Sequence, residues 1–179
     1  MQEIIWYGRG GQGVVTSAEV IALAAMKEGK YAQAFPSFGP ERRGAPVMAF
    51  NRISETPIES REQIHSPDIL IILDPTLLRT LQIKVKKDGL VIINSKKSLA
   101  ELKSKFNEAK IAVINATKIA LETFGIPLIN APMIGAFIKA TNLVNINSAL
   151  EIIKNKFPST AEKDEKAIKI AYNQVEIEK

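Results

Sequence analysis

Residues 4–29 read IIWYGRGGQGVVTSAEVIALAAMKEG, and this stretch decides the fold class. A short apolar run stops at a cluster of glycines, after which apolar residues recur at three- and four-residue spacing. That spacing predicts a helix over 14–27, with Gly29 as its stop signal. A strand, a glycine turn and a helix are the opening of a nucleotide-binding type of α/β unit.

The rest of the chain continues this alternation. Further strands are expected at 30–35, 47–53, 69–73, 90–93 and 111–114, and further helices at 76–85, 98–108, 117–124, within 133–157 and at 161–174. No helix separates the second strand from the third, so these two need not be parallel and we expect a mixed sheet. The sequence therefore predicts an α/β fold: a single three-layer Rossmann-like domain over residues 1–175, with a mixed, mostly parallel sheet and C-terminal helices. Residues 176–179 are expected to form a mobile tail.

Composition limits the chemistry that this chain can supply. Its 179 residues, 46% hydrophobic and 24% charged, fit one soluble globular domain. The chain has no cysteine, which excludes disulfides, cysteine-ligated iron–sulfur clusters, cysteine zinc sites and a thiol nucleophile. A single histidine, His65, argues against a His-rich metal site or Ser–His catalysis, so we expect no bound metal.

Charge and hydropathy limit the partners. The net charge is +5, but the lysines are spread from Lys84 to Lys179 between Glu, Asn and Ser residues, which is typical of a solvated surface. No nucleic-acid-binding signature accompanies them, so no nucleic-acid partner is expected. Neither a secretory signal nor the ~20 apolar residues that span a bilayer is visible. We expect a cytoplasmic location and no membrane partner.

The first candidate site is the glycine turn between the first strand and the first helix. It consists of Gly8, Arg9, Gly10, Gly11, Gln12 and Gly13, with the spacing Gly-x-Gly-x-x-Gly. Such a turn lets the backbone approach a phosphate, and the following helix offers free N–H donors to an anion. NAD is disfavoured, because the second strand ends in Gln33, Ala34 and Phe35 and lacks the acidic residue that holds a ribose. Anion binding and a purely structural turn or subunit contact both stay open.

The second candidate site is a rigid, charged loop, FGPERRGAP, at 38–46. Its candidate residues are Glu41, Arg42, Arg43 and Gly44. Paired guanidinium groups bind phosphates or carboxylates through two parallel hydrogen bonds. The alternative is a surface turn in which the arginines pair with Glu41 or face water.

Three further residues have more than one interpretation. Asp74 follows a predicted strand, where it could contact a ligand or cap the next helix. Asn130 could steer a turn or contact a partner. Trp6, the only tryptophan, suits core or interface packing.

Together these segments resemble the gamma subunit of 2-oxoacid:ferredoxin oxidoreductases. The resemblance covers about residues 3 to 158 and is carried by GRGGQG, YAQAFPSFGPERRGAPVMAFNRI, PDILIILDPTLL, VIIN and NAPMIGAFIKATNLVNINSALEIIKNKF. The sequence of the arginine loop is similar to that of the pyruvate and branched-chain 2-oxoacid members, so pyruvate is the favoured substrate and 2-oxoisovalerate the next. The related indolepyruvate type remains a third possibility.

The resemblance implies a subunit that is not active alone. In this family, thiamine diphosphate and iron–sulfur clusters lie on partner chains of the alpha, beta and delta type, and ferredoxin accepts the electrons of a complex built from heterotetramers. The overall reaction converts a 2-oxoacid and coenzyme A to an acyl-CoA and carbon dioxide. The glycine turn and arginine loop are then candidates for docking and for a shared coenzyme A site. The rival interpretations are a free-standing nucleotide-binding or flavin-linked oxidoreductase and a protein-binding module without a redox role.

Overall fold

The computed structural model describes residues 1–37, 45–106 and 108–178. Its strands are β1 Gln2–Arg9, β2 Tyr31–Pro36, β3 Pro46–Ser54, β4 Ile69–Ile72, β5 Leu90–Asn94, β6 Lys110–Ile114 and β7 Glu176–Ile177. Its helices are α1 Val14–Lys27, the 3-10 helix η1 Pro75–Arg79, α2 Leu99–Lys103, α3 Ala116–Phe124, α4 Asn130–Thr141, α5 Ile146–Lys156 and α6 Ala161–Gln174. Within these ranges, no helix is both long enough and apolar enough to cross a membrane.

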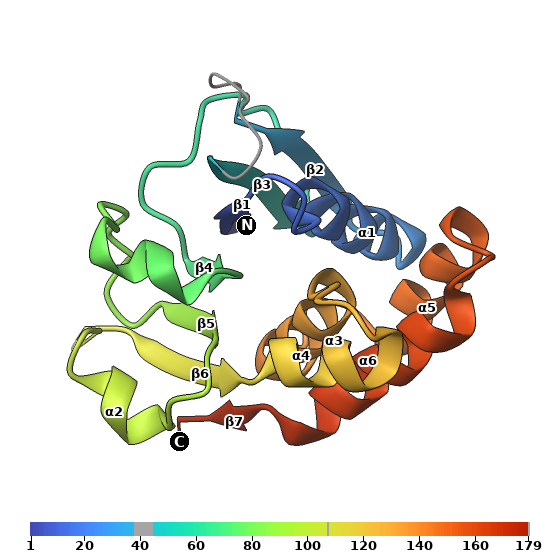
Figure 1. The fold of residues 1–179 in the computed structure, drawn as a ribbon. Coiled ribbons are helices and arrows are strands. Elements are labelled where there is room, and N and C mark those ends of the chain that lie inside the picture. The colour runs from blue at the N-terminus through green and yellow to red at the C-terminus, as the bar shows by residue number, and fades with distance from the viewer. Residues whose placement is uncertain (38–44, 107, 179) are drawn as a thin grey trace.

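The strands form one sheet in the order β2-β3-β1-β4-β5-β6-β7 (Figure 1). β1, β4, β5 and β6 are parallel neighbours, while β3 runs antiparallel to both β1 and β2. β1, β2, β4, β5 and β6 therefore point the same way, and only β3 and β7 oppose them among the described strands. This confirms the predicted mixed, mostly parallel α/β sheet.

One face of the sheet is covered by α1 and by the C-terminal helices α3, α4, α5 and α6 (Figure 1). Trp6 of β1 is fully buried there, with its ring centroid 5.3 Å from that of Phe137 in α4. Helices α4 and α6 approach so closely that a Cβ on Gly135 would lie 2.2 Å from the Ile168 carbonyl oxygen. Of the two interpretations of Trp6, core packing is therefore the one observed.

The opposite face has less helix than the sequence predicted. The helix expected over 76–85 ends at Arg79. Beyond it, Leu81, Ile83 and Val85 pack against the sheet while the residues between them are exposed, which is the two-residue alternation of an extended chain. The helix expected over 98–108 is limited to α2, after which Phe106 turns back onto the same apolar cluster. The third layer is thus mostly irregular chain around two short helices.

The C-terminal segment is attached to the sheet. Residues 176–177, expected in a mobile tail, form β7 and pair antiparallel with β6. The Glu178 carboxylate lies 2.7 Å from Lys103 Nζ and accepts a hydrogen bond from the Ile111 N–H at 3.1 Å. The sequence pattern missed this pairing because a two-residue strand carries no periodicity of its own.

A buried asparagine connects three elements of the helical face. Asn51 of β3 is fully buried, and its Oδ1 accepts a hydrogen bond from Trp6 Nε1 at 2.8 Å. Its Nδ2 donates to the carbonyl oxygens of Ala18 in α1 at 2.9 Å and Gln33 in β2 at 3.1 Å. One amide therefore satisfies polar groups of β1, α1 and β2 that are buried away from water.

We expect Asn51→Ala to lower the free energy of unfolding by about 2–4 kcal/mol, because it leaves the buried indole N–H of Trp6 without its acceptor and removes two hydrogen bonds to backbone carbonyls. Urea unfolding followed by circular dichroism measures the change. Asn173→Ala, on the exposed face of α6, is the matched control and should stay within about 0.5 kcal/mol of the parent. Equal effects of the two substitutions would contradict the bridging role of Asn51.

Candidate functional site

The candidate site lies at the edge of the sheet where the parallel strands end. The chain leaves β1 through α1 toward β2 and β3 on one side, whereas β4 and β5 lie on the other side. The ends of β1 and β4 thus flank a topological switch point, the place where open α/β sheets bind ligands. The glycine turn, Asp74 and Asn94 all lie at or just beyond the ends of strands at this edge.

The glycines of the turn have different tasks. A Cβ on Gly8 would lie 2.7 Å from Val14 Cγ2, and one on Gly13 would lie 2.7 Å from Asn130 Cβ, so both positions need glycine for packing. Gly13 also has a φ of 76°, and Gly11 has a φ of 90°. A Cβ on Gly11 would meet no atom within 4 Å, so this glycine is open to the surroundings. Gly8 and Gly13 are therefore structural, whereas another molecule could approach Gly11.

The two polar side chains of the turn, Arg9 and Gln12, form hydrogen bonds within the turn and to the residues after β4. Gln12 Oε1 accepts a hydrogen bond from the Arg9 N–H at 2.8 Å, and Gln12 Nε2 donates to Asp74 Oδ2 at 3.2 Å. Arg9 Nε lies 2.9 Å from the same carboxylate oxygen, and Arg9 Nη2 donates to Thr76 Oγ1 at 2.9 Å. Arg9 and Gln12, predicted as ligand-binding residues, therefore hold the turn against the end of β4.

Asp74 is a cap as well as an anchor. Its Oδ1 accepts hydrogen bonds from the Thr76 N–H at 2.9 Å and from Thr76 Oγ1 at 2.6 Å, which caps η1. Burial alone would raise the pKa of Asp74, but the hydrogen bonds from Thr76 and Gln12 and the charge of Arg9 hold it below its ordinary value. Both oxygens have two donors each, which favours the capping interpretation over ligand contact.

The arginine loop ends beside the glycine turn. Glu41, Arg42, Arg43 and Gly44 lie outside the described residues, as do the other positions of 38–44. The described end of the loop adjoins the turn, because Gly10 N–H donates to the Ala45 carbonyl oxygen at 3.1 Å and Pro46 pairs with Arg9. The two candidate segments are therefore neighbours at this edge of the sheet.

Two helices direct their N-termini at the turn. Neither α1 nor α4 has a side-chain cap among the described residues, although Pro132 in the first turn of α4 has no N–H to offer. Uncapped N–H groups at a helix start favour a nearby anion. Asn130, the first residue of α4, packs directly against Gly13 at the start of α1. The role of Asn130 is thus to join the two helix starts.

A hollow of about 470 Å³ lies in front of this arrangement. Its lining includes Gly10, Gly11, Gln12, Asp74, Asn94 and Ile129. The parallel β1–β2 pair of dinucleotide-binding folds is absent here, because β3 separates β1 from β2. This topology agrees with the sequence argument against NAD.

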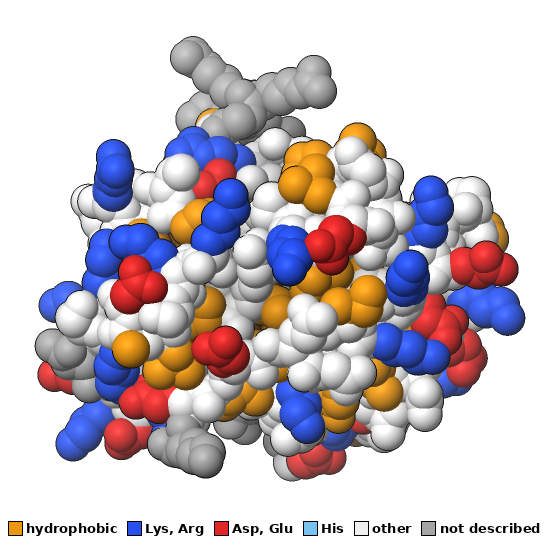
Figure 2. Space-filling view, turned by 60° about the horizontal axis from the view of Figure 1, so that its bottom comes forward, with side chains coloured by type: hydrophobic (Ala, Val, Ile, Leu, Met, Phe, Trp, Pro, Cys, Tyr) orange, Lys and Arg blue, Asp and Glu red, His pale blue; other side chains and the backbone are white. Residues whose placement is uncertain are grey.

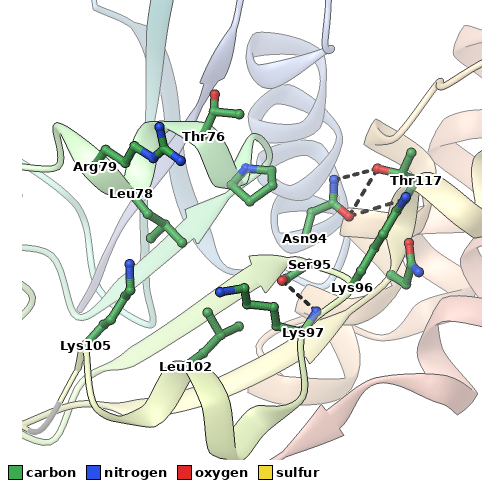
Figure 3. Close-up of a pocket in the computed structure, with 12 residues that line it drawn as sticks. Thr76, Leu78, Arg79, Asn94, Ser95, Lys96, Lys97, Leu102, Lys105 and Thr117 are labelled. Carbon is green, nitrogen blue, oxygen red and sulfur yellow. Dashed lines mark hydrogen bonds between the residues drawn. The ribbon is translucent and has the colours of Figure 1, made fainter.

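A second hollow, of about 590 Å³, continues from the first between η1 and α2. The two share Pro75, Asn94 and Thr117. Figure 3 shows Arg79, Lys97 and Lys105 extending toward the space between η1 and α2, with Asn94 and Ser95 to one side of it, toward Thr117. Sequence reasoning missed this hollow, although the Lys96-Lys97 pair directly after β5 places two cations at the same strand edge as the glycine turn.

Metal chemistry finds no support in the described parts of the chain. Residues 1–37, 45–106 and 108–178 contain no group of three or more His, Cys, Asp or Glu side chains that could hold an ion. His65 is exposed in the connection before β4, away from the hollows.

Residues 3–174 match the family model described as pyruvate ferredoxin/flavodoxin oxidoreductase. The pyruvate/ketoisovalerate oxidoreductases common subunit gamma of Pyrococcus abyssi is 50% identical over 182 residues, covering 99% of this chain and 98% of the relative. Pyruvate synthase subunit PorC of Methanothermobacter thermautotrophicus is 46% identical, covering 98% of this chain and 97% of the relative.

Solved structures have the same fold. The crystal structure of pyruvate oxidoreductase subunit PORC from Thermotoga maritima superposes with a TM-score of 0.88 at 33% identity, covering 99% of this chain and 98% of that one. A 2-oxoglutarate:ferredoxin oxidoreductase from Magnetococcus marinus, with 2-oxoglutarate, coenzyme A and succinyl-CoA bound, matches at TM-score 0.78 and 18% identity. This chain aligns over 97% of its length with 30% of that larger chain, which shows a shared fold.

We expect Asp74→Asn to lower the free energy of unfolding by about 1–3 kcal/mol at pH 7, because hydrogen bonds to a charged acceptor are lost. Ionised Asp74 stabilises the fold above its ordinary pKa, and this contribution disappears as the pH falls through the lowered pKa of the folded state. The difference between parent and variant should therefore shrink between pH 5 and the most acidic pH at which both still fold. Urea unfolding across that series tests this, with exposed Glu122→Gln in α3 as control. A difference that stays constant with pH would contradict the assignment.

Proposed function

The chain belongs to the pyruvate ferredoxin/flavodoxin oxidoreductase family, and we propose that it is the gamma-type subunit of a pyruvate:ferredoxin oxidoreductase. In this role it docks on the catalytic subunits and helps to hold coenzyme A. The complex converts pyruvate, coenzyme A and oxidised ferredoxin to acetyl-CoA, carbon dioxide and reduced ferredoxin. Thiamine diphosphate and the iron–sulfur clusters belong to the alpha, beta and delta-type partners and supply the carbanion and electron-transfer chemistry.

The observation that carries the coenzyme A proposal is the hollow beside Gly11. The uncapped N-termini of α1 and α4 meet beside it, and Gly11 places no side chain in the way. Free N–H groups at helix starts bind phosphate oxygens, and the pyrophosphate of coenzyme A is such a ligand. Because Arg9 offsets the charge of Asp74, the carboxylate at this edge does not oppose an incoming anion.

The position of the arginine loop also supports the coenzyme A proposal. The loop returns to the sheet at Ala45, which is hydrogen-bonded to Gly10 in the glycine turn. Arg42 and Arg43 precede Ala45 by three and two positions in the sequence. Their guanidinium groups suit phosphate oxygens, so we assign them to the same ligand.

Pyruvate is the favoured 2-oxoacid, and 2-oxoisovalerate is the alternative. The Pyrococcus abyssi relative is named as a subunit common to pyruvate and ketoisovalerate oxidoreductases. A shared chain cannot by itself distinguish two 2-oxoacids, whereas coenzyme A is needed with either acid. This supports a gamma subunit that handles the common substrate and leaves the choice of 2-oxoacid to its partners.

The subunit assignment predicts which proteins accompany the chain. Purified from its source without oxygen, it should be recovered in a complex with subunits that carry thiamine diphosphate and iron–sulfur clusters. Native mass spectrometry with metal and thiamine analysis measures this. Recovery as a lone protein at every salt concentration would instead favour a free-standing nucleotide- or protein-binding module. Nucleic acid is a poor candidate for such a partner, since Figure 2 shows cations and carboxylates interspersed over the face drawn.

The coenzyme A proposal predicts an effect at Gly11. In the intact complex, Gly11→Ala should raise the KM for coenzyme A about tenfold, equivalent to about 1.4 kcal/mol, without changing the KM for pyruvate. The added methyl group strains a backbone with φ of 90° and narrows the approach to the helix N-termini. Steady-state kinetics measure both constants, and Arg42→Ala and Arg43→Ala should act in the same direction.

Gly29→Ala is the matched control for this substitution. Gly29 has a φ of 82°, a Cβ there would also meet no atom within 4 Å, and it lies beyond the opposite end of α1. It should introduce similar strain and leave both KM values unchanged. If Gly11→Ala and the arginine variants dissociate the complex while the KM for coenzyme A is unaltered, these segments form an interface and the coenzyme A role is wrong.

A further inference from the structure

Asn94, the last residue of β5, lines the hollow beside Gly11 but uses its side chain inside the protein. It is 3% exposed, and its Nδ2 donates hydrogen bonds to the Leu73 carbonyl oxygen at 2.9 Å and to Thr117 Oγ1 at 3.0 Å. Its Oδ1 accepts from the Thr117 N–H at 3.3 Å and from Thr117 Oγ1 at 3.4 Å (Figure 3). Both hydrogens of the amide and both lone pairs of its oxygen therefore have protein partners.

The bonds to Thr117 make Asn94 a second cap of α3. Asn115, the N-cap residue, accepts a hydrogen bond from the Lys118 N–H at 3.0 Å, and Asn94 accepts the N–H of Thr117. Side chains thus satisfy two of the N–H groups that a helix start leaves open. In this respect α3 differs from α1 and α4, which have no side-chain cap among the described residues. The start of α3 therefore supports this edge of the sheet and does not serve as a third anion-binding helix start.

The bond to Leu73 fixes the end of β4 from the side of β5. Leu73 N–H donates to the Tyr7 carbonyl oxygen at 2.8 Å, which holds the same residue from the side of β1. Asp74 is next in the chain, and its Oδ2 accepts hydrogen bonds from Arg9 Nε at 2.9 Å and Gln12 Nε2 at 3.2 Å. The position of Asp74 therefore determines where the glycine turn is held.

We infer that Asn94 and Thr117 are positioning residues for the proposed coenzyme A site. They fix the end of β4, so that Asp74 holds Gln12 and, with it, the neighbouring Gly11. This inference rests on the proposed function and adds to it two residues that act through other side chains. Neither has to contact the ligand, because their effect reaches the glycine turn through the protein.

A purely structural role is the alternative, in which the same hydrogen bonds only stabilise the fold. Positioning is favoured because Asn94 and Thr117 line one hollow together with Gly10, Gly11 and Gln12. A fully satisfied polar network also fixes one arrangement of the elements that it joins. The network thus sets the relative position of α3, β5 and β4 at the place where the ligand is proposed to bind.

The test uses Thr117→Val, which removes the hydroxyl and keeps the shape and neutrality of the side chain. In the intact complex it should raise the KM for coenzyme A about threefold, and Asn94→Ala should raise it about tenfold, because the glycine turn is held less firmly. The kcat and the KM for pyruvate should stay the same. Thr117→Ser keeps the hydroxyl and should return the KM for coenzyme A to near the parent value. Steady-state kinetics measure all of these constants.

Asn145→Ala is the matched control for lost stability. Asn145 caps α5 by accepting a hydrogen bond from the Asn147 N–H at 2.9 Å, and it lines neither hollow. Its loss should lower the free energy of unfolding and leave the KM for coenzyme A unchanged. A similar rise in that KM with Asn145→Ala would show that reduced stability alone explains the effect, and positioning would be wrong.

A double variant distinguishes positioning from direct contact with the ligand. If Asn94 acts through Asp74 and Gln12, then Asn94→Ala combined with Gln12→Ala should raise the KM for coenzyme A by less than the product of the two single effects. Effects that multiply would mean that Asn94 contacts the ligand independently, which overturns the inference.

The remaining outcomes separate this inference from the proposed function. If Gly11→Ala raises the KM for coenzyme A but Thr117→Val and Asn94→Ala do not, the network is only structural and the proposed function stands. If none of the three raises it, the coenzyme A role fails and the positioning role fails with it. Should Asn94→Ala not fold, the comparison of Thr117→Val with Thr117→Ser still decides.

Discussion

The site depends on the lack of space for a side chain at the end of β1. A Cβ on Gly8 would lie 2.7 Å from Val14 Cγ2 and 3.1 Å from Leu73 Cβ, so the start of α1 and the end of β4 meet across this glycine. Leu73 N–H also donates to the Tyr7 carbonyl oxygen at 2.8 Å, which holds the end of β4 at this level. The chain must therefore turn sharply after β1, and α1 must begin at the strand edge with its N-terminus facing outward. A larger residue at position 8 would push the end of β1, the start of α1 and the end of β4 apart and would move the backbone N–H groups of α1 away from the strand edge.

The charges at this edge follow from the same contact. Because β1 and β4 end side by side, Arg9 and Asp74 lie within ion-pair distance and satisfy each other together with Gln12 and Thr76. The glycine turn is thus close to neutral, and its attraction for anions comes from peptide dipoles at two helix starts. One strand further along, four cations without ion-pair partners among the described residues surround the next hollow. Along this edge of the sheet, backbone donors lie beside β1, and flexible charged side chains lie beside β5, two strands away.

The sequence predicts the framework better than the site. The glycine turn, α1 and α6 were located to the residue, because glycine clusters and 3.6-residue periodicity are strong local signals. The helix prediction was wrong at Leu81, Ile83 and Val85. A short apolar segment can fit both the 3.6-residue period of a helix and the two-residue period of an extended chain, and only packing against the sheet decides between them. The sequence does not show that Arg9 and Gln12, which it predicts as ligand-binding residues, both donate hydrogen bonds to Asp74, 65 positions from Arg9. Lys96 and Lys97 were overlooked because an exposed lysine pair looks like ordinary surface until η1 and α2 enclose it.

Backbone N–H groups and lysine amines contribute differently to the binding of an anion. Backbone N–H groups at a helix start are fixed before binding, so they cost little entropy and select for the shape of the anion. Lysine amines lose side-chain freedom on binding, and their attraction is screened by salt, so they contribute long-range capture and recognition of an additional charge. The proposed pyrophosphate site at the switch point relies on donors of the first kind, because it is built from the backbone at two helix starts.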